Sequence, residues 1–394
     1  MTKRKVLIVA HHLTVGGSQK SLIAALKAID YEKNDVTLYV RKNRLDLLDQ
    51  VDDRVTVIVN EDPTHYYRHP KAIYYLLRIS VSKLLGKTEK CKQYKDRLSD
   101  INCEKMMDYE MSHYFKDAHY DVAIVYIQGY TADIVAKRIN ADRKYVFYHI
   151  STDEAHEFHE EIFKSFDKII AVSKLVQNEL QNNLYPQFAN KVAVIDNYVD
   201  YDRVISMAKE GDIDFDSSVF NICSCGRFTD VKGFDIAVEA ARRLKEKGMT
   251  FKWYFVGDGP MREDIEALID KYSLKDNIVI TGMTDNPYKY MAGCDIYVQP
   301  SYEDAQPLTV IEARMLCRPI VATRTMGATE QVKDRENGLL CDIDGNSLGD
   351  GVFDVLEDKK AYEKMVSNLK AVDFSKDFEI YCKRWEDLLD GNLK

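Results

Sequence analysis

The chain has 394 residues, which is more than one ordinary domain needs and predicts two hydrophobic cores. Its composition, 45% hydrophobic and 30% charged, is typical of a folded globular protein, and its net charge of −9 argues against general nucleic-acid binding. The eight cysteines form no CxxC pair and no interleaved pattern with histidines, which argues against a zinc site and indicates a reducing compartment.

The N-terminal half begins as alternating strands and helices. Residues 5–10, 36–40 and 55–59 are predicted to form buried strands. The first apolar run, residues 6–10, is too short for a signal sequence, and no later run approaches the length of a membrane span. Gly16 and Gly17 lie between the first strand and a helix predicted at residues 18–29. Glycines let a ligand approach the backbone, and a helix start stabilises an anion. A Gly-Gly pair is more often only a turn, so it predicts no ligand by itself.

Residues 65–97 form an unusually basic segment. They contain nine Lys or Arg and two acidic residues, a local charge of +7 within an acidic chain. Apolar residues recur at helical spacing, which predicts a basic amphipathic helix of the kind that lies on a membrane surface. The expected membrane contacts are Arg68, Lys71, Arg78, Lys83 and Lys87. The alternative is an ordinary helix that packs on its domain and has a solvated basic face.

A histidine near a strand end is the next candidate site residue. The apolar run at residues 144–150 predicts a strand, His149 lies at its end, and a helix is expected from Ser151 onward. Such a histidine is more often structural than functional, and His156 and His159 are expected on the surface of the following helix. The polar, acidic residues 202–218 then predict a domain boundary.

The C-terminal half restarts with a strand at residues 219–225, followed by Gly226, Arg227 and, five residues after the arginine, Lys232. A glycine permits close backbone approach, and a guanidinium and an ammonium together can neutralise a diphosphate. Arg and Lys at such spacing are more often solvated surface residues, so both interpretations stay open here.

The stretch from residue 299 to 323 combines a strand end, a polar loop and a helix start. In a parallel sheet, ligands bind beyond the carboxyl ends of the strands, and a helix start there favours a phosphate. Asp304 lies in the loop and Glu312 is expected in the first helical turn, where both could anchor a hydroxyl-rich, phosphorylated ligand. Alternatively, Thr309 to Glu312 fits a capping box, in which the Glu312 side chain bonds only the backbone N–H of the cap residue, Thr309.

This stretch resembles the signature of retaining GT-B glycosyltransferases of family 4 (glycosyl transferases group 1), of the bacterial cell-surface glycan type. In that signature, two glutamates separated by seven residues hold the nucleotide-sugar donor. Glu312 matches the second glutamate, and Asp304, with Glu303 beside it, replaces the first. The Gly-Gly loop, the strand that ends at His149 and the pair Arg227 and Lys232 resemble further motifs of the family in the same order.

The resemblance implies a site residue by residue. Asp304, Glu303 and His149 would lie near the reaction centre as catalytic residues, Arg227 and Lys232 would hold the diphosphate, and Glu312 would bind the ribose. The donor-binding residues that the resemblance implies are Gly16, Gly17, Arg227, Lys232, Gly282, Met283, Thr284, Ala305, Gln306, Pro307, Leu308 and Glu312.

The implied fold is α/β, with two Rossmann-like domains that face each other across a cleft. Residues 1–200 and a crossover helix in 375–394 would form the acceptor domain, and residues 201–374 the donor domain. The implied reaction moves a hexosyl or N-acetylhexosaminyl group from a UDP- or GDP-sugar to a glycan, a teichoic or capsular polymer, or a lipid-linked acceptor. It requires no metal and no other cofactor, because Arg and Lys take the charge role.

Two alternatives stay open: a nucleotide-sugar 2-epimerase on the same scaffold, and a catalytically silent partner subunit of a glycosyltransferase complex. We expect a cytoplasmic protein, peripheral at the inner face of the cell membrane if the basic segment binds lipid.

Overall fold

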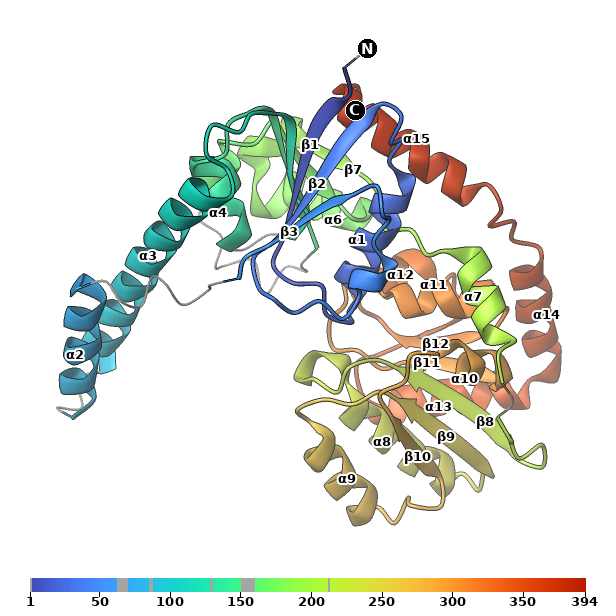
Figure 1. The fold of residues 1–394 in the computed structure, drawn as a ribbon. Coiled ribbons are helices and arrows are strands. Elements are labelled where there is room, and N and C mark those ends of the chain that lie inside the picture. The colour runs from blue at the N-terminus through green and yellow to red at the C-terminus, as the bar shows by residue number, and fades with distance from the viewer. Residues whose placement is uncertain (1, 62–69, 85–87, 128–129, 150–159, 212) are drawn as a thin grey trace.

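The computed structural model describes residues 2–61, 70–84, 88–127, 130–149, 160–211 and 213–394, and these form two β-sheets covered by helices (Figure 1). One sheet has seven strands in the order β3-β2-β1-β4-β5-β6-β7, and the other has six in the order β10-β9-β8-β11-β12-β13. The strands of both sheets pair in parallel. Strand order reverses between β1 and β4 and between β8 and β11, which are the places where parallel sheets bind ligands.

The first sheet and its helices come from the N-terminal half. Its strands are β1 (Arg4–Ala10), β2 (Asn34–Val40), β3 (Thr56–Val59), β4 (Tyr120–Val125), β5 (Ala141–Tyr148), β6 (Lys168–Ala171) and β7 (Val192–Val194). Its helices are α1 (Gly17–Ala28), α2 (Pro70–Leu84), α3 (Thr88–His113), α4 (Tyr130–Lys137), α5 (Glu160–Phe163) and α6 (Lys174–Glu179). Short non-α helical turns occupy Leu48–Gln50, Leu180–Leu184 and Pro186–Lys191.

The second sheet comes from the C-terminal half. Its strands are β8 (Phe220–Cys225), β9 (Phe251–Val256), β10 (Ile278–Gly282), β11 (Ile296–Gln299), β12 (Ile320–Thr323) and β13 (Gly338–Cys341). A short turn occupies Asp230–Lys232. The helices are α7 (Tyr201–Ala208), α8 (Phe234–Glu246), α9 (Arg262–Lys271), α10 (Tyr288–Gly293), α11 (Leu308–Met315), α12 (Met326–Gln331), α13 (Gly345–Glu357), α14 (Lys359–Lys370) and α15 (Asp377–Asp390).

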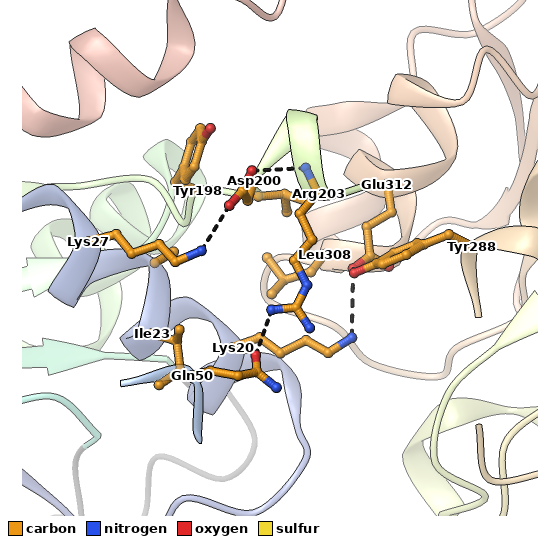
Figure 2. A pocket seen from close by; sticks show the side chains of 12 residues that line it. Lys20, Ile23, Lys27, Gln50, Tyr198, Asp200, Arg203, Tyr288, Leu308 and Glu312 are labelled. Atoms are coloured by element: carbon orange, nitrogen blue, oxygen red, sulfur yellow. Dashed lines mark hydrogen bonds and ion pairs between the residues drawn. The ribbon is translucent and has the colours of Figure 1, made fainter. Parts of the chain in front are cut away.

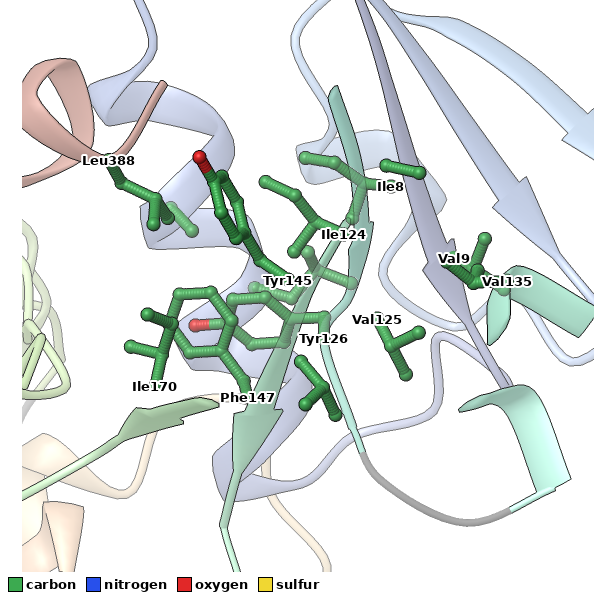
Figure 3. Close-up of a cluster of buried hydrophobic side chains, with 14 of the residues drawn as sticks. Ile8, Val9, Ile124, Val125, Tyr126, Val135, Tyr145, Phe147, Ile170 and Leu388 are labelled. Atoms are coloured by element: carbon green, nitrogen blue, oxygen red, sulfur yellow. The ribbon is translucent and has the colours of Figure 1, made fainter. Parts of the chain in front are cut away.

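The core of the first domain explains the continuous apolar runs in the sequence. Residues 6–10 of β1 are fully buried, as expected for a strand covered on both faces. Side chains of β1, β4, β5 and β6 meet Leu388 of the last helix, α15, in one cluster (Figure 3). The ring of Trp385 on α15 stacks 5.3 Å from that of Phe147 on β5. The C-terminal helix therefore packs on the sheet formed by the start of the chain.

The chain crosses between the domains twice, after β7 and between α14 and α15. The two crossings touch each other through aromatic rings. Tyr198 in the first crossing lies 5.2 Å, centroid to centroid, from both Phe378 and Tyr381 of α15. Tyr201 stacks at 5.8 Å on Phe374 of the second crossing. Both crossings thus form one aromatic junction.

The basic segment is not one helix, as predicted, but parts of two. Helices α2 and α3 pack along each other and extend away from the first sheet (Figure 1). The predicted contacts Lys71, Arg78 and Lys83 lie exposed on α2, whereas Arg68 and Lys87 lie outside the described residues. Among the described helices, none combines the length and apolar character needed to span a bilayer.

A buried ion pair fastens α3 to the first sheet. Arg41, just after β2, donates through Nε and Nη2 to the two carboxylate oxygens of Glu110, each at 2.7 Å. Tyr39 donates to the same carboxylate at 2.9 Å. The side chains of Arg41 and Glu110 are 2% and 0% exposed. Because both charges are buried, loss of either side chain would leave the other as an unpaired buried charge, which is strongly destabilising.

Two further predicted segments remain. Helix α7 covers the first residues of the polar segment 202–218 predicted as a domain boundary, and the Asp200 carboxylate caps it by accepting from the backbone N–H of Arg203 at 3.1 Å. The helix predicted from Ser151, with His156 and His159, falls outside the described residues.

Candidate active site

Three loops from the two domains meet at the strand-order reversals. The Arg227 guanidinium, after β8, donates to the backbone carbonyl of Val15, after β1, at 3.1 Å. A Cβ placed on Gly17 would lie 3.8 Å from Leu308 Cδ1 at the start of α11. The Gly-Gly loop, the β8 loop and the start of α11 therefore lie together, and two helix N-termini point to this place.

A glycine brings Lys232 into this group. Gly233 has φ +64°, and a Cβ there would lie 2.0 Å from the carbonyl oxygen of Pro300. Only glycine tolerates both the left-handed conformation and this close approach. The approach places Lys232 beside the β11 loop, where Nζ forms an ion pair with Asp304 Oδ2 at 2.6 Å.

The acidic pair Glu303 and Asp304 is half-buried in the β11 loop. The Asp304 side chain is 9% exposed, and its Oδ2 also accepts from the Ser301 hydroxyl at 3.4 Å. The Asp304 backbone carbonyl accepts from the N–H of Gly327 at 2.8 Å, which fixes the loop to α12. Asp304, which was expected near the reaction centre, thus neutralises Lys232, which was expected to hold the diphosphate.

Glu312 is the fifth residue of α11, in the second turn and not in the first turn as predicted. The capping-box alternative is also wrong. The N-cap is Pro307, and Thr309 donates its hydroxyl to Gln299 Oε1 at 2.9 Å. Glu312 itself is 3% exposed and accepts from the Tyr288 hydroxyl at 3.0 Å.

A pocket between the domains opens onto Glu312 (Figure 2). Three cations line it: Lys20 and Lys27 of α1, and Arg203 of α7. Lys27 pairs with Asp200 at 3.0 Å, and Lys20 Nζ lies 4.0 Å from Glu312 Oε1. Cations beside a buried carboxylate suit a ligand that carries both anionic and hydroxyl groups.

The other predicted donor contacts are dispersed around this centre. Gln306 accepts through Oε1 from the backbone N–H of Asn197 in the first crossing at 3.1 Å, and Ala305 and Pro307 are buried. The remaining three lie at the edge of the second sheet: Gly282 is the last residue of β10, and Met283, which is 66% exposed, and Thr284 follow it.

His149 lies directly after β5, with its ring centroid 5.1 Å from that of Tyr126. Burial lowers the pKa of His149 to about 4, so the imidazole is neutral at neutral pH. It can thus offer a hydrogen bond but no charge. The residues that follow it, 150–159, are not among the described ones.

Sequence reasoning missed His12, Lys20 and Tyr288. The His12 Nδ1 atom lies 2.9 Å from the Thr14 hydroxyl, and burial followed by nearby cations, Arg227 among them, lowers its pKa. The sequence could have pointed to His12, because His11 and His12 directly follow the first predicted strand at the edge where parallel sheets bind ligands. Within the described ranges, no group of three or more His, Cys, Asp or Glu side chains is arranged to bind a metal.

Comparison with known proteins gives the class of this site. Residues 209–372 match the family model described as Glycosyl transferases group 1. A glycosyltransferase of Methanocaldococcus jannaschii, itself uncharacterised, is 30% identical over 231 residues, or 58% of each chain. A Campylobacter jejuni enzyme is 30% identical over 218 residues, 54% of this chain and 58% of that one. Its name is N-acetylgalactosamine-N,N'-diacetylbacillosaminyl-diphospho-undecaprenol 4-alpha-N-acetylgalactosaminyltransferase.

The fold likeness extends over the whole chain. A crystal structure of an S. aureus TarM mutant with fondaparinux, alpha-GlcNAc-glycerol and UDP aligns with TM-score 0.70 and 16% identity, over 98% of this chain and 100% of that one. The predicted fold class is therefore confirmed: two facing α/β domains in the GT-B arrangement. The family match assigns residues 209–372, the body of the second domain, to the group 1 glycosyltransferases.

Proposed function

We propose that this protein is a retaining glycosyltransferase that uses a UDP- or GDP-sugar. The observation that carries the proposal is that Arg227 donates to Val15 in the Gly-Gly loop of the opposite domain, while Lys232 pairs with Asp304 in the loop before α11. The first residue of α11, Leu308, lies next to Gly17 of the Gly-Gly loop. A guanidinium, an ammonium and two helix N-termini converge there, which is the set of groups that a diphosphate needs. The group 1 match over residues 209–372 supports the same assignment.

The acceptor is proposed to be a cell-surface glycan, a teichoic or capsular polymer, or a lipid-linked sugar, bound on the first domain. Two comparisons support this class. The Campylobacter jejuni relative is named for a diphospho-undecaprenol acceptor, and the TarM structure holds UDP together with alpha-GlcNAc-glycerol.

In the proposed reaction, the acceptor hydroxyl attacks the anomeric carbon on the face that the diphosphate leaves. The bond from that carbon to the diphosphate oxygen breaks, the new glycosidic bond forms, and the acceptor proton passes to the leaving diphosphate. Arg227 and Lys232 stabilise the charge that develops on the leaving group, which is the main catalytic effect. Asp304, released from Lys232 by the diphosphate, and Glu303 would then face the sugar, with neutral His149 as a further sugar contact.

We also propose that α2 holds the protein on an anionic membrane surface, close to a lipid-linked acceptor. The side chains of Ile73, Leu77, Val81 and Leu84 recur three or four residues apart on α2 and are 51%, 64%, 50% and 87% exposed. Such a stripe exposes apolar area that a soluble surface rarely leaves uncovered. The basic residues of the same helix suit anionic headgroups, which favours lipid over a second copy of this basic surface.

The central proposal is tested by titrating UDP and GDP into the protein and into a variant that combines Arg227→Met with Lys232→Met. We expect micromolar binding of one nucleotide and a loss of at least about 100-fold in the variant, since each charge-assisted contact contributes on the order of 1.5–3 kcal/mol. The matched control replaces Arg242 and Lys245 of α8, which bond Asn346 and Ser273 instead.

Product analysis then separates the reaction classes. Retention at the anomeric carbon, read by NMR of the product, supports the proposal, and inversion contradicts it. Interconversion of the free nucleotide sugar without acceptor would identify a 2-epimerase. Nucleotide binding without hydrolysis or transfer would identify a silent subunit.

A further inference from the structure

The partner of Glu312 is a tyrosine from a neighbouring helix. The Tyr288 hydroxyl, at the first residue of α10, donates to Glu312 Oε1 at 3.0 Å. Both residues are buried, at 5% and 3% exposure. A buried carboxylate without such a donor would be costly, so this hydrogen bond decides how the carboxylate is oriented.

The opposite domain contributes the second contact to the same oxygen. Lys20 Nζ of α1 lies 4.0 Å from Glu312 Oε1 and 5.6 Å from the centre of the Tyr288 ring. Figure 2 shows the three side chains converging on one wall of the pocket. In the described part of the chain, both contacts fall on Oε1. The other carboxylate oxygen remains able to accept hydrogen bonds from a ligand.

We propose that Tyr288 is a positioning residue that orients Glu312 toward the ribose hydroxyls and so determines preference for ribonucleotides over deoxyribonucleotides. The inference rests on the proposed function, because it assumes a nucleotide donor. The carboxylate can rotate about its terminal bond when nothing fixes it, since that torsion is broad. With Oε1 held by the phenol, the carboxylate keeps one direction and receives the ribose without reorganising.

The consequence for specificity follows from unpaired polar groups. A site built to bond a hydroxyl rejects the analogue that lacks it, because its own polar group is then left without a partner. If Glu312 is held in place, removal of a ribose hydroxyl should weaken binding strongly. If Glu312 is free to turn away, the same removal should matter less.

The test compares UDP with 2′-deoxy-UDP and 3′-deoxy-UDP, and the matching guanine nucleotides, by calorimetry on the full chain. We expect the wild type to bind the ribonucleotide at least about 10-fold more tightly than one deoxy analogue. Tyr288→Phe removes only the hydroxyl. It should reduce the ribose ratio, which is the Kd of the deoxy analogue divided by the Kd of the ribonucleotide, by about 5-fold or more. Tyr290→Phe is the control, since that tyrosine lies on the same helix and contacts Tyr254 by its ring.

A double-mutant cycle separates positioning from general destabilisation. Since Tyr288 acts through Glu312, Glu312→Gln and the double variant Tyr288→Phe with Glu312→Gln should show the same ribose ratio. Additive effects on that ratio, or an unchanged ratio in Tyr288→Phe, would overturn the inference. Absence of any UDP or GDP binding by the wild type would instead contradict the proposed function, so the two failures are distinguishable.

Discussion

Lys232 and Asp304 form an ion pair with 2.6 Å between Nζ and Oδ2, at the place where the donor diphosphate is proposed to bind. The lysine cannot fully serve both anions, because it is a single compact charge with three donors. We therefore expect donor binding to involve an exchange of partners, in which the phosphate oxygens replace the Asp304 carboxylate at Lys232.

Asp304→Asn should strengthen UDP or GDP binding by about 5-fold while it lowers the transfer rate by about 10-fold or more. The change removes a negative charge close to the diphosphate, and it also removes the carboxylate proposed to face the sugar. Calorimetry and initial rates check the two parts separately. The matched control is Asp230→Asn in the same region, whose carboxylate accepts from the neighbouring backbone N–H of Val231. Weaker nucleotide binding in Asp304→Asn would contradict the exchange.

The stability of the wild type should fall as the pH is lowered from about 6.5 toward 4, in part because of His149. Burial depresses the folded-state pKa of His149 to about 4, so between these values the unfolded chain binds the proton more readily. The expected contribution at pH 5 is about 2 kcal/mol relative to pH 7.5. His149→Phe keeps the ring contacts and removes the titration, so urea unfolding should show a smaller pH dependence. An equal dependence in both proteins would show that His149 is not buried as described.

Loss of the Glu110 carboxylate should destabilise the first domain. Glu110→Leu leaves the buried Arg41 without its carboxylate partner, which costs about 3–5 kcal/mol. The variant that also carries Arg41→Met replaces the pair by apolar groups and should recover most of that loss. Glu386→Gln, at an exposed pair with Lys33, is the control and should change the free energy of unfolding by less than about 1 kcal/mol. Additive losses in the Arg41 and Glu110 double variant would contradict this account.

Leu77→Ser combined with Leu84→Ser should reduce co-sedimentation with vesicles that contain phosphatidylglycerol by about 10-fold or more. Each substitution removes an exposed apolar side chain that would enter the membrane interface. Activity on a water-soluble acceptor should be unchanged. The control is Ile380→Ser, since Ile380 is 59% exposed on α15, away from α2. Unchanged vesicle binding, or binding that is equal on neutral phosphatidylcholine, would contradict anionic membrane contact through α2.

The strands of the two sheets could be predicted because each strand has an apolar pattern within its own few residues. Residues 6–10 of β1 are continuously apolar, as burial on both faces requires. Helix α3 could not be predicted over its full length, since its residues are mostly polar and it is held by the contact of Glu110 with Arg41, 69 positions earlier. An ion pair with a residue far away in the chain produces no periodic apolar pattern in the sequence of the helix, so the helix could not be predicted from it.

The sequence supplied candidate site residues but not the side chains that contact them. Glu312 was selected by the resemblance to the family signature, but Tyr288 lies 24 positions away and Lys20 belongs to the other domain. The error about the helix start also has a local cause. Pro307 has the extended backbone of an N-cap, so α11 begins one residue after it and Thr309 falls inside the helix.

The aromatic junction of Tyr198 and Tyr201 with α15 and Phe374 has a mechanical consequence. The two chain crossings lie side by side between the two domains. Such an arrangement acts as a hinge and favours rotation of one domain against the other about a single axis. Contacts next to the axis, such as the hydrogen bond between Asn197 and Gln306, would change little when the two domains open. The bond between Arg227 and Val15 bridges the domains through loops outside that junction, so it would be among the contacts that break to admit a nucleotide.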